Sequence, residues 1–278
     1  MKAYHRPTTV QDALDVLSGG HARIVAGCTD LFPATGAREL QGQVVDITAI
    51  ADLRGVMRAS GGWRIGAATR WVDVMRADLP AAFHMLQQAA REVGSVQIQN
   101  TATVAGNLCN ASPAADGVPC LLALDAVVEI GSAAGVRRVA IGDFITGIRQ
   151  TVLRPGEMVL AVHVPDAAAR GRSRFLKLGA RRYLVISIAM VAVRLEIESG
   201  GITRAAVAVG ACSAVARRMV RLEAVLEGAR LEDAANRVEA SLVLPDLAPI
   251  DDIRADASYR GVAALELIRR AVIDLVQT

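Results

Sequence analysis

The most constraining feature of this sequence is the segment at residues 103–116, TVAGNLCNASPAAD, which combines a small-residue turn with amide and carboxylate side chains. Ala105 and Gly106 have little or no side chain to hold a ligand away from the backbone, so successive N–H groups can converge on phosphate oxygens. Ser112 and Pro113 have the residue types of a helix N-cap and first helical position. An ordinary strand-to-helix connection would use the same residue types, so this segment alone leaves both interpretations open.

A second loop of the same kind, IVAGCTDL, lies upstream at residues 24–31. It begins with an apolar, strand-like pair, turns at Ala26 and Gly27, and then offers the Thr29 hydroxyl and backbone amides. Two such loops could each bind one phosphate of a diphosphate, which favours a dinucleotide over a mononucleotide. The first strand is not followed by G-x-G-x-x-G, and G-x-x-x-x-G-K-[ST] does not occur, so neither a Rossmann nor a P-loop site is predicted.

Composition excludes several function classes. With 278 residues, of which 53% are hydrophobic, the chain can build a sizeable core in one large or two to three smaller domains. A net charge of +3, with arginines spread along the chain, does not predict nucleic-acid binding. The longest apolar stretch, near residues 185–193, is far shorter than the roughly 20 residues of a membrane span. The first residues contain no apolar signal segment, so we expect a cytoplasmic protein.

The cysteines and histidines do not suggest metal or nucleophilic chemistry. The four cysteines form no C-x-x-C pair, so we expect reduced, mostly buried thiols and no metal site. The four histidines are scattered, and Ser112 lacks the G-x-S-x-G context of a hydrolase. No catalytic side chain is therefore predicted.

Periodicity predicts an α+β chain whose arrangement of helices and strands changes near residues 165–173, where we expect a domain boundary. Before this point, short helices and strands alternate, and a polar extended stretch at 95–103 leads into the second loop. After it, two β segments at 185–197 and 202–211 are joined by Ser199-Gly200-Gly201, a predicted hairpin. Three helices are then expected, at 215–226, 231–242 and 258–276.

The two loops, followed by Ser112-Pro113-Ala114-Ala115-Asp116, resemble the FAD-binding medium subunit of the molybdenum hydroxylases, which include bacterial xanthine dehydrogenase and aerobic carbon monoxide dehydrogenase. The resemblance continues through residues 174–182 to about 251–260. It implies a PCMH-type (vanillyl-alcohol oxidase-like) FAD domain of two α/β subdomains at 1–170 (about 1–55 and 56–170). A C-terminal α+β domain with an antiparallel sheet and helices is expected at 171–278. The cysteine-rich insertion of the benzoyl-CoA-reducing members is missing.

The resemblance also implies which residues contact FAD. Asp116, which would equally favour a helix dipole, matches a flavin-contacting position, and Lys177 matches a cation that would stabilise reduced flavin unless it only reaches solvent. Val93 stands where some relatives place an aromatic ring. The expected cofactor-binding residues are Ile24, Val25, Ala26, Gly27, Cys28, Thr29, Asp30, Leu31, Thr103, Val104, Ala105, Gly106, Asn107, Asp116, Val159 and Lys177.

Two positions depart from the family pattern. The common bacterial loops have Gly-Gly where this chain has Gly27-Cys28 and Ala105-Gly106. If either position needs a positive φ, its Cβ would cost about 1 kcal/mol and weaken flavin binding. Some animal relatives carry asparagine at the position of Cys28, so we expect Ala105 to be the more disruptive replacement.

The function that the resemblance implies is electron transfer. FAD on this chain would take electrons from 2Fe-2S clusters of a small partner subunit and pass them to an external acceptor such as NAD or a quinone. Hydroxylation would occur on a molybdopterin-binding large subunit, in a dimer of heterotrimers. One alternative is a self-sufficient FAD-dependent NAD(P)H oxidoreductase on the same fold. Another is a flavin-free assembly protein that kept the fold after its loops changed.

Overall fold

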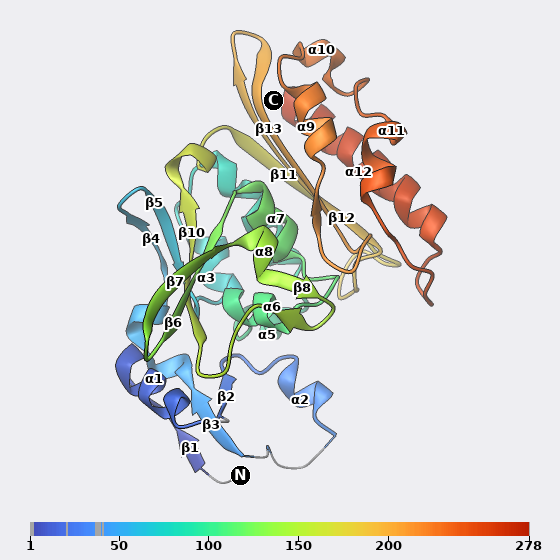
Figure 1. The fold of residues 1–278 in the computed structure, drawn as a ribbon. Helices are drawn as coiled ribbons and strands as arrows, with labels where there is room; N and C mark the ends of the chain where they lie inside the picture. Colours follow the sequence, from blue (N-terminus) through green and yellow to red (C-terminus); the bar gives the residue numbers. More distant parts are fainter. Residues whose placement is uncertain (1–2, 21, 37–39, 41, 278) are drawn as a thin grey trace.

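The structure, a computed structural model, describes residues 3–20, 22–36, 40 and 42–277, and its strands gather into separate sheets along the chain (Figure 1). The N-terminal part is a parallel sheet in the order β1-β3-β2, with Ala13, Leu14 and Leu17 of α1 buried beside it. The first loop leaves the carboxyl end of β2. The elements are β1 (Ala3–His5), α1 (Val10–Ser18), β2 (Ala22–Val25), α2 (Leu31–Ala34), β3 (Gln43–Asp46) and the 3-10 turns η1 (Ile47–Ala49) and η2 (Ala51–Leu53).

The central part is an antiparallel sheet in the order β4-β5-β10-β6-β7, with several short helices packed beside it (Figure 1). Its strands are β4 (Val56–Ala59), β5 (Gly62–Gly66), β6 (Val127–Ser132), β7 (Gly135–Ala140) and β10 (Met158–Pro165), with a small hairpin of β8 (Ile145–Gly147) and β9 (Gln150–Thr151). Its helical elements are α3 (Trp71–Arg76), η3 (Ala81–Phe83), α4 (His84–Glu92), α5 (Val96–Gln99), α6 (Val104–Asn110), α7 (Gly117–Ala123), α8 (Ile141–Phe144) and η4 (Asp166–Ala168).

The C-terminal part is an antiparallel sheet in the order β11-β12-β13-β14, with α12 packed along β11 and β12 (Figure 1). Alternate residues of β12 enter two cores: Met190 joins the central core, and Val191 joins the core beneath α12. A strand buried on both faces is apolar throughout, which explains the long apolar run in the sequence. The elements are β11 (Arg172–Leu178), β12 (Ala189–Glu198), β13 (Gly201–Gly210), β14 (Arg217–Arg218), α9 (Val220–Leu226), α10 (Leu231–Ala234), α11 (Ala240–Val243), η5 (Leu244–Asp246) and α12 (Ala257–Val276).

The α+β class and the predicted hairpin are confirmed. Ser199 and Gly200 both have positive φ, 50° and 79°, as a two-residue turn between twisted strands requires. These two residues therefore form the turn that separates β12 from β13.

Several local predictions are wrong. The stretch at 95–103 is not extended, because the Ser95 hydroxyl accepts a hydrogen bond from the Ile98 N–H and starts α5. Ser112 and Pro113 form a turn instead of a helix start, and α7 begins at Gly117. The expected helix at 231–242 is split into α10 and α11, and Val238 between them is buried in the core. The strand expected from 185 begins only at Ala189.

The C-terminal sheet holds both ends of α7. At its carboxyl end, the guanidinium groups of Arg194 and Arg218 donate to the carbonyl oxygens of Ala123 (3.0 Å) and Leu122 (2.9 Å). Cations at this end also stabilise the helix dipole. At the amino end, Asp116 contacts side chains of the C-terminal part. Helix α7 is thereby fixed between the two parts of the molecule, next to the cavity described below.

Candidate functional site

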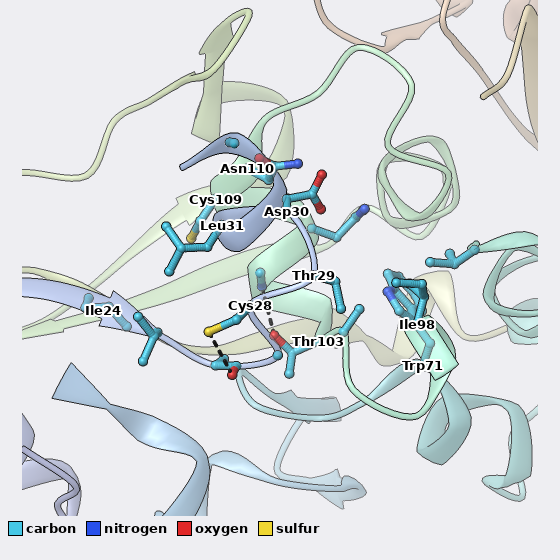
Figure 2. Close-up of a pocket in the computed structure, with 18 residues that line it drawn as sticks. Ile24, Cys28, Thr29, Asp30, Leu31, Trp71, Ile98, Thr103, Cys109 and Asn110 are labelled. Carbon is cyan, nitrogen blue, oxygen red and sulfur yellow. Dashed lines mark hydrogen bonds between the residues drawn. The ribbon is translucent and has the colours of Figure 1, made fainter. Parts of the chain in front are cut away.

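A cavity of about 360 Å³ lies between the loop after β2 and helix α6, so the structure brings the two glycine-containing loops together (Figure 2). In Figure 2, Ile24 lies at one end of the lining, Cys28 and Thr29 in the middle, and Trp71 with Ile98 at the other end. The lining residues are Ile24, Val25, Ala26, Gly27, Cys28, Thr29, Asp30, Leu31, Ala34, Trp71, Val93, Ile98, Ala102, Thr103, Gly106, Asn107, Cys109 and Asn110.

Gly27 of the first loop packs against the backbone of Thr101 and Ala102, just before the second loop. A Cβ on Gly27 would lie 2.1 Å from the carbonyl oxygen of Thr101 and 2.8 Å from Cα of Ala102. Only glycine permits so close a contact between two backbones. Gly27, which the sequence predicts to bind a ligand, thus also makes the close backbone contact between the two loops.

Cys28, and not Ala105, is the strained replacement. Cys28 has a φ of 56°, in the left-handed region, whereas Ala105 lies inside α6 and is buried. The expectation that Ala105 is the more disruptive position is therefore wrong, because a helical residue needs no positive φ. The Cβ of Cys28 carries a strain of about 1 kcal/mol that glycine would not.

The backbone donors of the second loop are already used by the protein. Val104 and Ala105 donate their N–H groups to the carbonyl oxygens of Thr69 (2.9 Å) and Ala67 (3.2 Å). The Gly106 N–H donates to the hydroxyl of Thr103, which caps α6. The expectation that these N–H groups converge on a ligand is wrong, because a tertiary contact and a helix cap satisfy them. This loop offers side chains to the cavity instead.

The first loop keeps its backbone donors. No acceptor among the described residues pairs with the N–H groups of Gly27, Cys28 or Thr29. Burial, together with the Asp46 carboxylate, raises the pKa of the Cys28 thiol, so this side chain stays neutral at physiological pH. Successive unpaired N–H groups beside a neutral side chain have the chemistry that phosphate oxygens require.

Two side chains of the lining have unpaired polar atoms. Trp71 is fully buried, and within the described part of the chain its Nε1 has no hydrogen-bond partner. The Oδ1 atom of Asn107 is buried and unpaired in the same way. Unpaired donors and acceptors in a wall are costly, and a polar ligand is one way to offset that cost. Free N–H groups, a glycine contact and unpaired side-chain atoms in one cavity fit a dinucleotide such as FAD.

Asp116, Lys177 and Ser187 form a buried cluster that does not line the cavity. Lys177 Nζ lies 2.7 Å from Asp116 Oδ2 and 3.3 Å from the carbonyl oxygen of Glu92, and the Ser187 hydroxyl donates to Asp116 Oδ1 at 2.6 Å. Burial raises the pKa of Asp116, although the ammonium and hydroxyl groups oppose this shift. The cluster adjoins the cavity wall, because Glu92 precedes the lining residue Val93.

Not every predicted contact residue reaches the cavity. Residues 24–31, Thr103, Gly106 and Asn107 line it, whereas Val104, Ala105, Asp116, Val159 and Lys177 do not. Val159 is a core residue of β10 that pairs with Ile130 of β6, in keeping with its strand periodicity. A direct contact between FAD and these five residues stays a prediction.

Sequence reasoning missed several lining residues. No local signal in the sequence indicates that the apolar side chains of Trp71 and Ile98 face a cavity. The expectation of mostly buried cysteines holds for Cys120 and Cys212, but Cys109 is exposed and Cys28 is half-buried. Both of these cysteines line the cavity.

Two features of the described residues concern metal ions and membranes. Among them, no three histidine, cysteine, aspartate or glutamate side chains gather as metal ligands would. In the same residues, no helix combines the length and apolar character that crossing a bilayer requires.

Comparison with known families covers nearly the whole chain. The family described as the FAD binding domain in molybdopterin dehydrogenase matches residues 1–167. The family described as the CO dehydrogenase flavoprotein C-terminal domain matches residues 174–275. Fold, cavity and family matches together define a flavoprotein component of an oxidoreductase that binds FAD.

Individual relatives match this chain over most of their length. The chain is 32% identical to the putative xanthine dehydrogenase FAD-binding subunit of Escherichia coli strain K12, over 93% of this chain and 90% of the relative. It is 30% identical to the glyceraldehyde dehydrogenase medium chain of Sulfolobus acidocaldarius, over 97% and 96%. A crystal structure of the Cu,Mo-CO dehydrogenase superposes with a TM-score of 0.91 at 28% identity, over 99% and 98%. The chain therefore belongs to the FAD-binding medium subunits of the molybdenum hydroxylase family.

Proposed function

We propose that this chain is the electron-transfer subunit of a molybdopterin-dependent hydroxylase or dehydrogenase. FAD in the cavity takes electrons from 2Fe-2S clusters of a small partner subunit and passes them to an external acceptor. A large partner subunit holds the molybdopterin cofactor, and two heterotrimers associate. Two relatives of this chain are named as a medium chain and an FAD-binding subunit, and this chain spans at least 90% of each of them.

The observation that supports this role best is the cavity itself. The unpaired N–H groups of the first loop lie opposite α6, in a chain matched from end to end by two flavoprotein families. We propose that Gly27, Cys28 and Thr29 donate to the FAD diphosphate, and that Thr103 and Asn107 bind from the facing helix. FAD supplies the capacity to accept electrons in pairs and release them singly.

The buried Lys177–Asp116 pair adjusts the electrostatics of this site. Both side chains are only 7% exposed, so charge changes nearby are weakly screened by water. We propose that the ammonium of Lys177 stabilises negative charge on reduced flavin, and that Asp116 limits this effect by pairing with it. The reduction potential of the bound flavin then depends on how Asp116 is held.

The test is to purify the tagged full-length chain from cells that express it naturally and to compare it with a Gly27→Ala variant. The wild-type chain is expected to copurify with subunits that carry molybdenum and iron, and substrate should reduce its flavin. Complexes with Gly27→Ala should keep the molybdenum and the reducible clusters but lose electron transfer to the acceptor, while Gly36→Ala, with no atom near its Cβ position, behaves as wild type. A chain that is isolated alone and turns over NADH at full rate with a soluble dye would contradict the proposal and support the self-sufficient oxidoreductase.

A further inference from the structure

Trp71 and Asn107 carry complementary polar atoms that face the same small space. Trp71 is the first residue of α3, and Asn107 lies in α6. Among the described residues, Nε1 of Trp71 is a buried donor without an acceptor, and Oδ1 of Asn107 is a buried acceptor without a donor. Both residues line the FAD cavity.

Gly117 lies against the side chains of both Trp71 and Asn107. A Cβ on Gly117 would lie 2.4 Å from Cη2 and 3.1 Å from Cζ2 of Trp71, and 3.3 Å from Oδ1 of Asn107. The benzene edge of the indole and the amide oxygen of Asn107 therefore both lie next to Gly117, and Nε1 is separated from Cζ2 by one ring atom. The indole ring occupies the position that a Cβ at residue 117 would need, so only glycine fits here.

Backbone hydrogen bonds keep the two helices in register. The Trp71 N–H donates to the Ala102 carbonyl (3.2 Å), and the Val104 N–H donates to the Thr69 carbonyl (2.9 Å). The start of α3 and the start of α6 are therefore tied on both sides.

Asp116 is not an open acceptor for the indole. Its two oxygen atoms already accept hydrogen bonds from Lys177 and Ser187. Among the polar atoms described around Gly117, the amide oxygen of Asn107 is thus the acceptor that lacks a donor. Buried polar groups in native proteins are nearly always paired, so this donor and this acceptor suit one another as hydrogen-bond partners.

We propose that Trp71 is a positioning residue for FAD: its indole N–H donates to Asn107 Oδ1 when the cofactor binds, and this turns the amide NH₂ of Asn107 toward the cavity. The NH₂ group then donates to an oxygen atom of the cofactor. An amide free to rotate would present its oxygen half of the time and repel that atom. This inference rests on the assignment of the cavity to FAD and is independent of the electron acceptor.

The direct test is nuclear magnetic resonance of the full-length, ¹⁵N-labelled chain. The sequence has two tryptophans, so the spectrum has two indole N–H signals, and Trp63→Phe assigns them. With saturating FAD, the Trp71 proton should move downfield and exchange more slowly with solvent, and Asn107→Ala should remove both changes. The proposal is overturned if wild type and Asn107→Ala give the same response, or if the wild-type chain binds no FAD.

Affinity measurements give an independent result. Trp71→Phe keeps an aromatic ring but removes the donor, so the Kd for FAD should rise roughly fivefold to tenfold. Trp63→Phe is the matched control, because Trp63 packs against Phe83 and Arg58 away from the cavity. In the Asn107→Ala background, Trp71→Phe should weaken binding no further. Fully additive losses would show that Trp71 acts by packing alone, whatever the melting temperatures of the variants.

Discussion

Replacing Gly27 by alanine should separate the two loops and abolish tight FAD binding. The added Cβ would lie 2.1 Å from the Thr101 carbonyl oxygen, whereas real Cβ atoms essentially never come closer than 3.0 Å to another heavy atom. The clashing atom belongs to the backbone and cannot rotate away. The first loop must therefore retreat by about 1 Å, at a cost of about 1 to 3 kcal/mol.

The same displacement moves the cofactor donors. A hydrogen bond of about 2.9 Å that lengthens by about 1 Å is no longer a hydrogen bond. Two charge-assisted bonds from the loop to phosphate oxygens, at about 1.5 kcal/mol each, are then lost. The Kd for FAD should rise by roughly 100-fold or more.

Titration of the apoprotein with FAD, followed by flavin fluorescence or calorimetry, measures this change. Gly36→Ala is the matched control, because its Cβ would meet no heavy atom of the described residues within 4 Å and the residue lies on the same connection between β2 and β3. If Gly27→Ala binds FAD and unfolds like the control, the contact with Thr101 does not aim the loop, and the reasoning fails.

Three further predictions follow from single side chains. Cys28→Gly should relieve the left-handed strain at this residue and, after the entropy cost of glycine, leave the stability within about 1 kcal/mol of wild type. The β-branched variant Cys28→Val should instead lose at least about 1 kcal/mol of stability. Urea unfolding that shows no difference between the two variants would contradict the strain. Lys177→Met leaves the Asp116 carboxylate buried without its counter-charge, which should cost about 3 kcal/mol at neutral pH. Adding Asp116→Asn should recover part of this loss in thermal unfolding. The backbone N–H of Arg254, helped by two guanidinium groups, lowers the pKa of Asp252 to about 2. The ionised carboxylate therefore contributes fully to folding stability above the unfolded pKa of 3.8, and this contribution is lost as the pH falls toward about 2. Asp252→Asn should flatten this part of the pH profile of the urea midpoint.

Much of the architecture follows from local sequence. The turn at Ser199-Gly200 and the apolar runs around it specify the hairpin of β12 and β13, and the helical periodicity from Ala257 predicts α12. The two glycine-containing segments also stand out in the sequence, because their small residues let the backbone approach other groups closely. The family resemblance added the order of these features along the chain.

The errors arose where a residue had two local options. The sequence allows Ser112 to cap a helix or close a turn, and it allows Ser95 to follow an extended stretch or cap a helix. Tertiary packing chose between them. Ala105 shows the same limit, because its place inside a helix, and hence the absence of strain, depends on Thr103 capping α6.

The sequence by itself determined that two small-residue segments exist and that a long hairpin with a C-terminal helix follows them, because turns, caps and periodicity are properties of neighbouring residues. Tertiary structure alone decided which loop keeps its N–H groups free, since Thr69 and Ala67 take those of α6. It also paired Asp116 with Lys177 and Ser187, 61 and 71 residues away. Hydrogen-bond acceptors and buried charges are shared between distant segments, and only the folded chain shows which partner each group has found.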